Sequence, residues 1–205
     1  MIRKILSALI LALASAVPLT ASAVIIGFDN EVGTGLFNGP STEDGFTYAL
    51  HSGLLVTSDD PGRGNPEPAM EGRASAGGGV LSIVRDGGGL FTFDAAEVAQ
   101  YLLGDAVAVT FEGFLGAASV GVDSFLATSI PADWQNSAST NLAGVAIDAL
   151  RIGLPASSAG DAFWWSSVDN VALTALDDQR VPEPTSLALL GLGLAGAARR
   201  RRRRA

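Results

Sequence analysis

The central part of the chain alternates between apolar and polar residues, and turn-forming residues recur about every eight to twelve positions. Alternation with a period of two is typical of strands that bury one face. The pattern predicts strands at 24–29, 45–50, 54–58, 80–85, 90–94, 106–114, 119–126, 145–152 and 163–176. Residues 59–71 are proline-rich and aperiodic, which favours a surface loop, and 95–103 allows one helical turn.

Two glycine-containing segments suggest how these strands connect. Asp86-Gly87 suits a hairpin turn, and Gly116 marks the bend of a second hairpin. Many short strands within one stretch predict an all-β fold, a single jelly-roll-like β-sandwich over residues 24–181. No second domain is visible in the pattern.

The first 23 residues have the three parts of a secretory signal peptide. Arg3 and Lys4 precede an apolar run over 5–17, which at 1.5 Å per residue is a helix of about 20 Å, too short for a bilayer core of about 30 Å. The small residues up to Ala23 suit signal peptidase, so we expect cleavage between Ala23 and Val24. The alternative is a retained membrane anchor.

The C-terminal segment, 182–205, also has three parts. Pro182-Glu183-Pro184 is stiff and extended because proline fixes φ and restricts the residue before it. The apolar stretch 187–198 forms a helix of only about 18 Å, and the arginines at 199–204 hold that end in the cytoplasm. We therefore expect a short hydrophobic helix that lodges transiently in the inner membrane.

This order of motif, short apolar span and arginine cluster resembles the PEP-CTERM sorting signal. The resemblance implies a Gram-negative bacterium that makes exopolysaccharide, and an exosortase, a membrane-embedded cysteine protease, that processes the tail. Similar tails end some ice-binding proteins, but the regular threonine-rich repeats that ice binding would need are not present in this sequence. The glycines at 191, 193 and 196 match a dinucleotide-binding pattern, yet no predicted strand precedes them, so they belong to the membrane segment.

Charge and composition exclude several functions. The net charge of −8 is uneven: between residues 24 and 184 lie all 21 acidic residues and only five basic ones, which leaves −16. Such a surface argues against nucleic acid as a partner. The chain has no cysteine, which excludes disulfides and thiol nucleophiles.

Two short motifs weakly resemble galactose-binding-like jelly rolls, which many carbohydrate-binding modules adopt. They are Phe28-Asp29-Asn30 near the first strand and the segment 168–174 in the last one. The resemblance implies a structural calcium ion, for which the candidate ligands are Asp29, Glu31 and Asp169. The alternative is that Asp169 accepts hydrogen bonds from turn N–H groups or lies at the solvated end of its strand. No other cofactor is expected.

Alternation along the last strand places Asp169 on the inward face with Val171 and Leu173, and leaves Trp164 facing outward. An outward Trp164 is a candidate platform for stacking a sugar ring, and core packing is the alternative.

The sequence contains little that suggests catalysis. His51 is the only histidine, no G-x-S-x-G elbow is present, and His51 is expected to lie in a turn. Adjacent carboxylates that glycoside hydrolysis would need fall in predicted turns, at 43–44, 59–60 and 177–178. The sequence therefore predicts a non-enzymatic exported protein with a structural or adhesive role at the cell surface or in the exopolysaccharide matrix. The alternative is a carbohydrate-binding module that contacts matrix glycan, and the least favoured function is glycoside hydrolysis.

Overall fold

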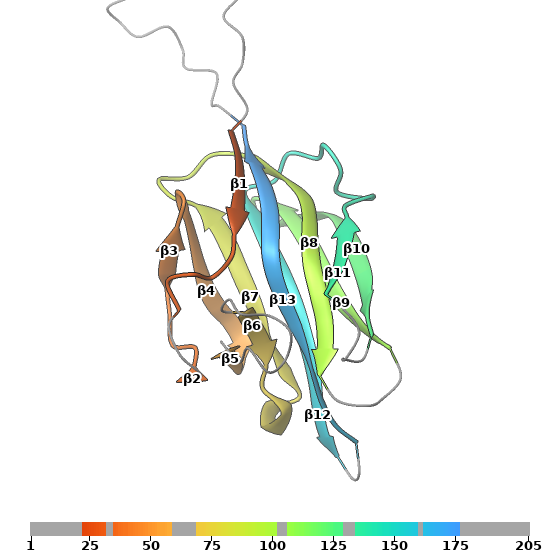
Figure 1. The fold of residues 1–205 in the computed structure, drawn as a ribbon. Coiled ribbons are helices and arrows are strands. Elements are labelled where there is room, and N and C mark those ends of the chain that lie inside the picture. The colour runs from red at the N-terminus through yellow and green to blue at the C-terminus, as the bar shows by residue number, and fades with distance from the viewer. Residues whose placement is uncertain are drawn as a thin grey trace, which may run out of the picture.

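A computed structural model describes residues 22–31, 35–58, 69–101, 106–128, 134–159 and 162–176. These residues form strands almost throughout, with one short 3₁₀ helix, η2 (Ala74–Ala76) (Figure 1). The strands are β1 (Ser22–Ile26), β2 (Gly35–Leu36), β3 (Ser41–Glu43), β4 (Phe46–Gly53), β5 (Leu55–Ser58), β6 (Ala69–Gly72), β7 (Gly78–Arg85), β8 (Phe91–Tyr101), β9 (Val107–Leu115), β10 (Ala118–Ala127), β11 (Gln135–Ala138), β12 (Ala149–Ala159) and β13 (Ala162–Ala175).

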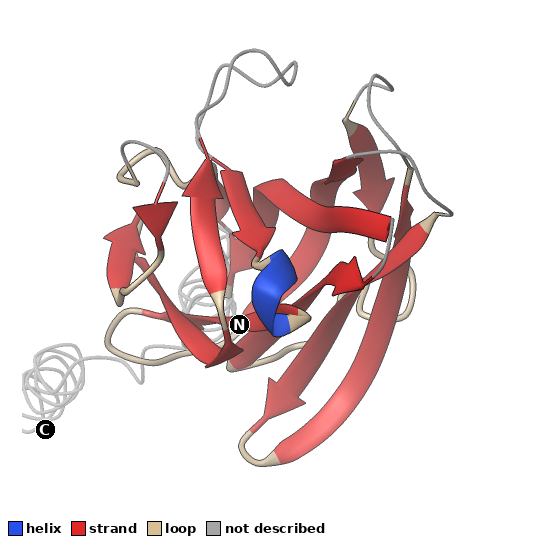
Figure 2. Cartoon of the chain, turned by 90° about the horizontal axis from the view of Figure 1, so that it is seen from below, coloured by secondary structure: helices blue, strands red, loops and turns tan. Residues whose placement is uncertain are grey.

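All the pairings between these strands are antiparallel, and they form two layers. In what we call sheet A the order is β2-β5-β6-β13-β8-β11, and β1 pairs with the last part of β13. In sheet B the order is β3-β4-β7-β12-β9-β10. The hairpin of β12 and β13 joins the two sheets, because the end of β12 pairs with the start of β13. Figure 2 shows the layers from below, with η2 between strands.

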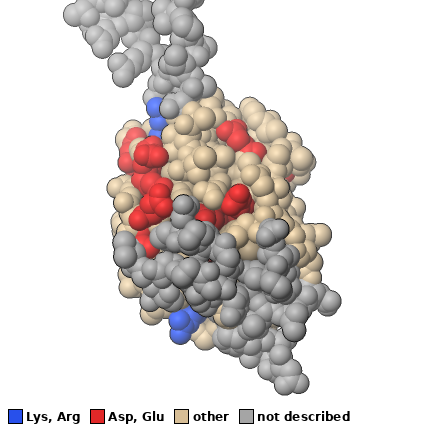
Figure 3. Space-filling view, viewed as in Figure 1, with Lys and Arg blue, Asp and Glu red and all other residues tan. Residues whose placement is uncertain are grey.

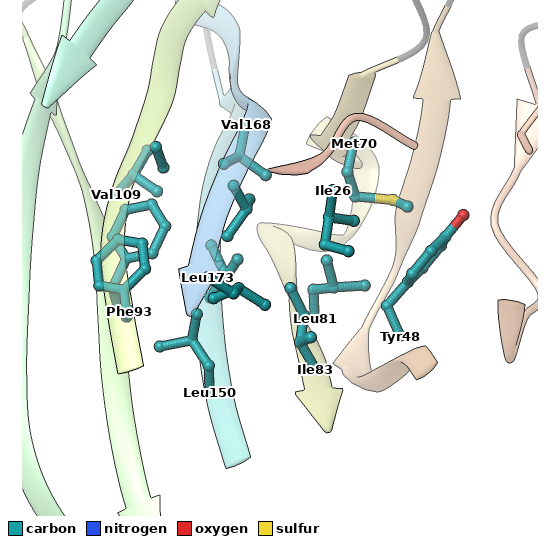
Figure 4. Packing of buried hydrophobic residues seen from close by; sticks show 14 of the residues in the cluster. Ile26, Tyr48, Met70, Leu81, Ile83, Phe93, Val109, Leu150, Val168 and Leu173 are labelled. Atoms are coloured by element: carbon teal, nitrogen blue, oxygen red, sulfur yellow. The ribbon is translucent and has the colours of Figure 1, made fainter. Parts of the chain in front are cut away.

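The core lies between the two sheets and is rich in aromatic and branched aliphatic side chains (Figure 4). Phe93 of sheet A stacks on Phe111 of sheet B with ring centroids 4.8 Å apart. Phe91 meets Phe46 edge to face at 5.2 Å. Such pairs add to the free energy gained from burying the rings themselves.

Two compensating bulges keep apolar residues pointing into this core. Between Asp169 and Ala172, β13 contains one more residue than β8 opposite it, and between Phe93 and Ala95 the extra residue is in β8. Asn170, within the first bulge, has a positive φ of 48°. Each bulge inverts the side-chain alternation of its strand, so inward residues continue on both sides of it.

The β-sandwich class predicted from the sequence is confirmed, and every predicted strand is present in part or in full. The hairpin at Gly116 is also confirmed, as the turn between β9 and β10. The helical turn at 95–103 is wrong for the described part of that segment, because 95–101 continues β8 as a strand. The predicted loop 59–71 is wrong at its end, since 69–71 belongs to β6, whose four residues are all buried. The turn at 86–87 connects β7 of sheet B to β8 of sheet A and so does not close a hairpin.

The two terminal helices expected from the sequence, in 1–23 and 182–205, lie outside the described residues, apart from Ser22 and Ala23 in β1. Within the described ranges, no helix has the length and apolar character that crossing a membrane requires. The predicted domain boundaries at residues 24 and 181 stay predictions.

Candidate functional site

The structure reverses the predicted orientation of the residues in the first half of β13. Val168 and Val171 both belong to the core although they are three positions apart, because the bulge at Asn170 lies between them. Trp164 therefore shares the side of Val168, and Asp169 lies on the opposite side. The prediction that Asp169 points inward with Val171 and Trp164 outward is wrong for this reason.

The two tryptophans of β13 lie in the hairpin that links the sheets. Trp164 is opposite Ser157 of β12, and Trp165 is opposite Ala156 of β12 and Tyr101 of β8. Both indole side chains are half-buried, so neither stands free on the surface as a fully exposed platform would. Each of the two residues is nonetheless partly accessible to solvent.

The three candidate calcium ligands have separate surroundings. Asp29 is exposed after β1. Glu31 accepts hydrogen bonds from Ser41 Oγ and, at 3.3 Å, from the buried Tyr48 hydroxyl. Asp169 is buried opposite Glu97 of β8, and its Oδ1 accepts the Asn170 N–H at 2.7 Å. Among the described residues no three His, Cys, Asp or Glu side chains form a group suited to a metal ion.

Asp29 instead lines an acidic depression of about 340 Å³ beside the β3–β4 turn, together with Glu43, Asp44 and Asp86. Burial raises the pKa of Glu43, and the nearby charges of Asp29 and Asp44 raise it further, although the Gly27 N–H donates to its Oε1 at 2.9 Å. Glu43 and Asp44 are one of the adjacent acidic pairs from the sequence, and they lie at a hairpin turn as predicted. The pairs at 59–60 and 177–178 lie outside the described residues.

His51 does not lie in a turn between strands, as the sequence suggested. It is exposed within β4, at an irregularity in the pairing with β7 between Leu50 and Ser52. An extra residue at such a point leaves the strand pairing intact on either side.

The outer face of sheet B carries a feature that the sequence analysis did not single out. Arg151 of β12 lies over the ring of Phe114 of β9, 4.1 Å from its centroid, and the register places it between Ser82 of β7 and Glu112 of β9. Its buried Nε has no hydrogen-bond partner in the described part of the chain. Residues 150–154 alternate, and Leu150, Ile152 and Leu154 are buried. This alternation in the sequence could have predicted that Arg151 faces outward.

The same face contains a shallow depression and an aliphatic margin. The depression, of about 380 Å³, is bordered by Ser52, Val80, Thr110, Gly153 and Pro155. Exposed aliphatic side chains lie on the same face in β7 and β10: Val84 is 38% exposed, Val122 44% and Leu126 61%. We call the exposed side of sheet B, with Arg151 and these aliphatic residues, the outer face of sheet B.

Comparison with known proteins identifies the C-terminal segment. Residues 180–203 match the PEP-CTERM protein-sorting motif. A mutant of a family 29 carbohydrate-binding module, solved with mannohexaose, is 9% identical, with 76% of this chain and 93% of the module covered and a TM-score of 0.37. An isomalto-dextranase from Arthrobacter globiformis T6, solved with panose, is 12% identical, with 78% of this chain and 33% of the enzyme covered and a TM-score of 0.37. TM-scores this low assign no function to the chain. No curated protein matches the sequence.

The chain is thus a β-sandwich protein whose last strand leads into a C-terminal sorting signal. That signal is of the PEP-CTERM type, which implies export and an exosortase as the processing partner.

Proposed function

We propose that this protein is placed at the surface, or in the exopolysaccharide matrix, of a Gram-negative cell, where its β-sandwich serves a structural or adhesive role without catalysis. The observation that carries the proposal is the sorting motif at 180–203, which begins shortly after β13 ends at Ala175. The leader at 1–23 delivers the chain to signal peptidase and the inner membrane, and the exosortase then acts on the tail.

The outer face of sheet B supports an adhesive role. Its exposed residues Val84, Val122 and Leu126 are aliphatic, and scattered acidic residues keep the rest of the surface soluble. In the view of Figure 3 acidic side chains form several patches on the described surface, whereas basic ones show near its two ends.

A substitution in the sorting motif tests the proposal. Glu183→Ala removes the charged residue between the two prolines, so we expect the variant to keep its full C-terminal mass and to stay with the inner membrane. Gln179→Ala, just before the motif, is the matched control and should be processed like the original protein. Mass spectrometry of the C-terminal peptide, in cells with and without the exosortase, gives the readout. A processed Glu183→Ala protein would contradict the proposal.

Carbohydrate binding is the second candidate function, and the half-buried ring of Trp164 in the hairpin between the sheets favours it. An aromatic ring that is partly open to solvent can stack on a sugar ring. We expect Trp164→Ala to abolish retention on matrix polysaccharide in a pull-down, while Leu36→Ala, which removes a 52% exposed aliphatic side chain in β2, leaves retention unchanged. Equal retention by the two variants would exclude Trp164 as the glycan contact and leave the structural or adhesive role.

A further inference from the structure

The first strand of the sandwich contains the bond at which the leader is expected to be cut. β1 begins at Ser22, so Ala23 and Val24 both lie within it. In the antiparallel pairing Ala23 is opposite Thr174 and Val24 is opposite Leu173. Figure 1 shows β1 beside β13 at the end of the sandwich where β1 begins and β13 ends.

Docking of β1 is an integral part of the fold. Ile26, opposite Val171, is completely buried, and so is Phe28 just after the strand. Val24 packs against the same core and is half-buried. Undocking β1 therefore exposes apolar surface, at a cost of about 25 cal/mol for each Å², so in the folded domain the strand is rarely free.

A peptidase binds its substrate as an extended segment whose backbone groups are free to pair with the enzyme. While β1 is paired with β13, the segment on both sides of the Ala23–Val24 bond lies against β13 along one edge, so it cannot enter an enzyme cleft as a free extended peptide. We propose that leader removal and β1 docking exclude one another, so that signal peptidase must cut the chain before β1 docks on β13. This inference rests on the proposed export through the leader. Hydrolysis consumes one water molecule, breaks the Ala23–Val24 amide, and leaves a carboxylate on Ala23 and an amino group on Val24.

Cleavage also changes the end of β13. Ser22 and Ala23 are the partners of Ala175 and Thr174, and both leave with the leader. The mature β1 is left with Val24, Ile25 and Ile26, so the last two residues of β13 lose their neighbours on that side. Leu176 keeps its own contacts, because its N–H donates to the Leu90 carbonyl at 2.9 Å and its carbonyl accepts from Arg85 Nη1 at 2.7 Å. The new amino terminus at Val24 thus lies opposite Leu173, close to the end of β13.

A reversible cross-link between β1 and β13 tests the order of events. Ile25 and Ala172 are paired across the two strands, and Ile25 is 57% exposed. Because the chain has no cysteine, Ile25→Cys with Ala172→Cys can form only one disulfide. The substitutions leave Ala23 and Val24 unchanged. The full precursor in detergent is incubated with signal peptidase in oxidised form, in reduced form, and after unfolding in urea followed by dilution into the enzyme.

We expect the oxidised precursor to be cut at least about tenfold more slowly than the reduced one, because cleavage of a paired segment depends on its transient opening. The freshly diluted precursor should be cut fastest, and N-terminal sequencing should give Val24. The single variant Ile25→Cys controls for the substitution and should behave like the original chain. Equal rates for the oxidised and reduced forms, or failure of the disulfide to form, would overturn the inference while leaving the proposed export intact. If even the diluted precursor is not cut between Ala23 and Val24, the leader assignment itself fails.

Discussion

The carboxylate of Asp123 organises a whole loop. It is buried on β10 and accepts hydrogen bonds from the backbone N–H groups of Thr140, Asn141 and Leu142, and from the Ser139 and Thr140 hydroxyls. Burial by itself would raise the pKa of Asp123, but these bonds outweigh it and hold the pKa below its ordinary value. One acid thereby accepts hydrogen bonds from five donors in residues 139–142.

We predict that Asp123→Asn lowers the free energy of unfolding by about 2–4 kcal/mol, because an amide offers one acceptor oxygen and turns an N–H₂ group toward donors. Urea unfolding measures the change. Asp148→Asn is the control, because Asp148 accepts one bond, from the Gly116 N–H at 2.7 Å. The control should lose about 1 kcal/mol or less.

The same residue predicts a pH dependence. The folded pKa of Asp123 is lower than the unfolded one, so its stabilising effect is complete above about pH 4 and is lost as the pH falls through the folded value. The free energy of unfolding, measured at several pH values between 5 and 2, should therefore fall less with decreasing pH for Asp123→Asn than for the original protein. If the free energy of unfolding fell equally in both proteins, acidic residues other than Asp123 would be responsible for the loss of stability at low pH.

Only some of these residue-level features can be read from sequence. Alternation places Asp123 inward among apolar neighbours, but its partners 16 to 19 positions away depend on how the loop folds back. The stacking of Arg151 on Phe114 likewise depends on the register between β9 and β12, which no local pattern encodes. Orientation on β13 was predicted incorrectly because one asparagine inserts a residue into the ladder.

At the scale of elements, the bulge at Asn170 decides which side chains of β13 face the core. Asn170 adopts a left-handed conformation, its N–H donates to Asp169 Oδ1, and its Nδ2 donates to Glu97 Oε2 at 3.0 Å. A β-branched residue fits this conformation badly, whereas glycine fits it well.

We predict that Asn170→Val lowers the free energy of unfolding by about 2–3 kcal/mol, since it combines backbone strain with loss of the bond to Glu97. Asn170→Gly should lose only about 1 kcal/mol, because it gives up the bond but relieves the strain. Thermal or urea unfolding of the pair separates the two contributions. Equal losses in both variants would mean that the backbone conformation at 170 costs little.

Long elements were easier to predict than short ones. The predicted segments all correspond to strands of four residues or more, whereas β2, β3, β6 and β11, of two to four residues, were missed. A strand that short has too few positions to display a period, and β6 is buried on both faces, so it shows no alternation. The helical turn expected at 95–103 has the same origin: the bulge at Asp94 disturbs the alternation just where β8 continues.

At the scale of the whole molecule, calcium stays a prediction. If an ion joins Asp29, Glu31 or Asp169 to further oxygen atoms, then removing it with a chelator should lower the melting temperature of the mature protein by roughly 5 °C or more from that measured with saturating calcium. Magnesium added back in place of calcium is the control, because it demands a tighter octahedral site. An unchanged melting temperature would show that the mature protein is not stabilised by a bound calcium ion.

The position of β13 has a mechanical consequence. The strand pairs with β8 from Trp165 to Ala175, and in the sequence the sorting motif follows from residue 180. Tension transmitted through an attached C-terminus would run along the strand axis, across inter-strand hydrogen bonds that lie perpendicular to it. The bonds of the ladder would then bear the load together instead of opening one after another.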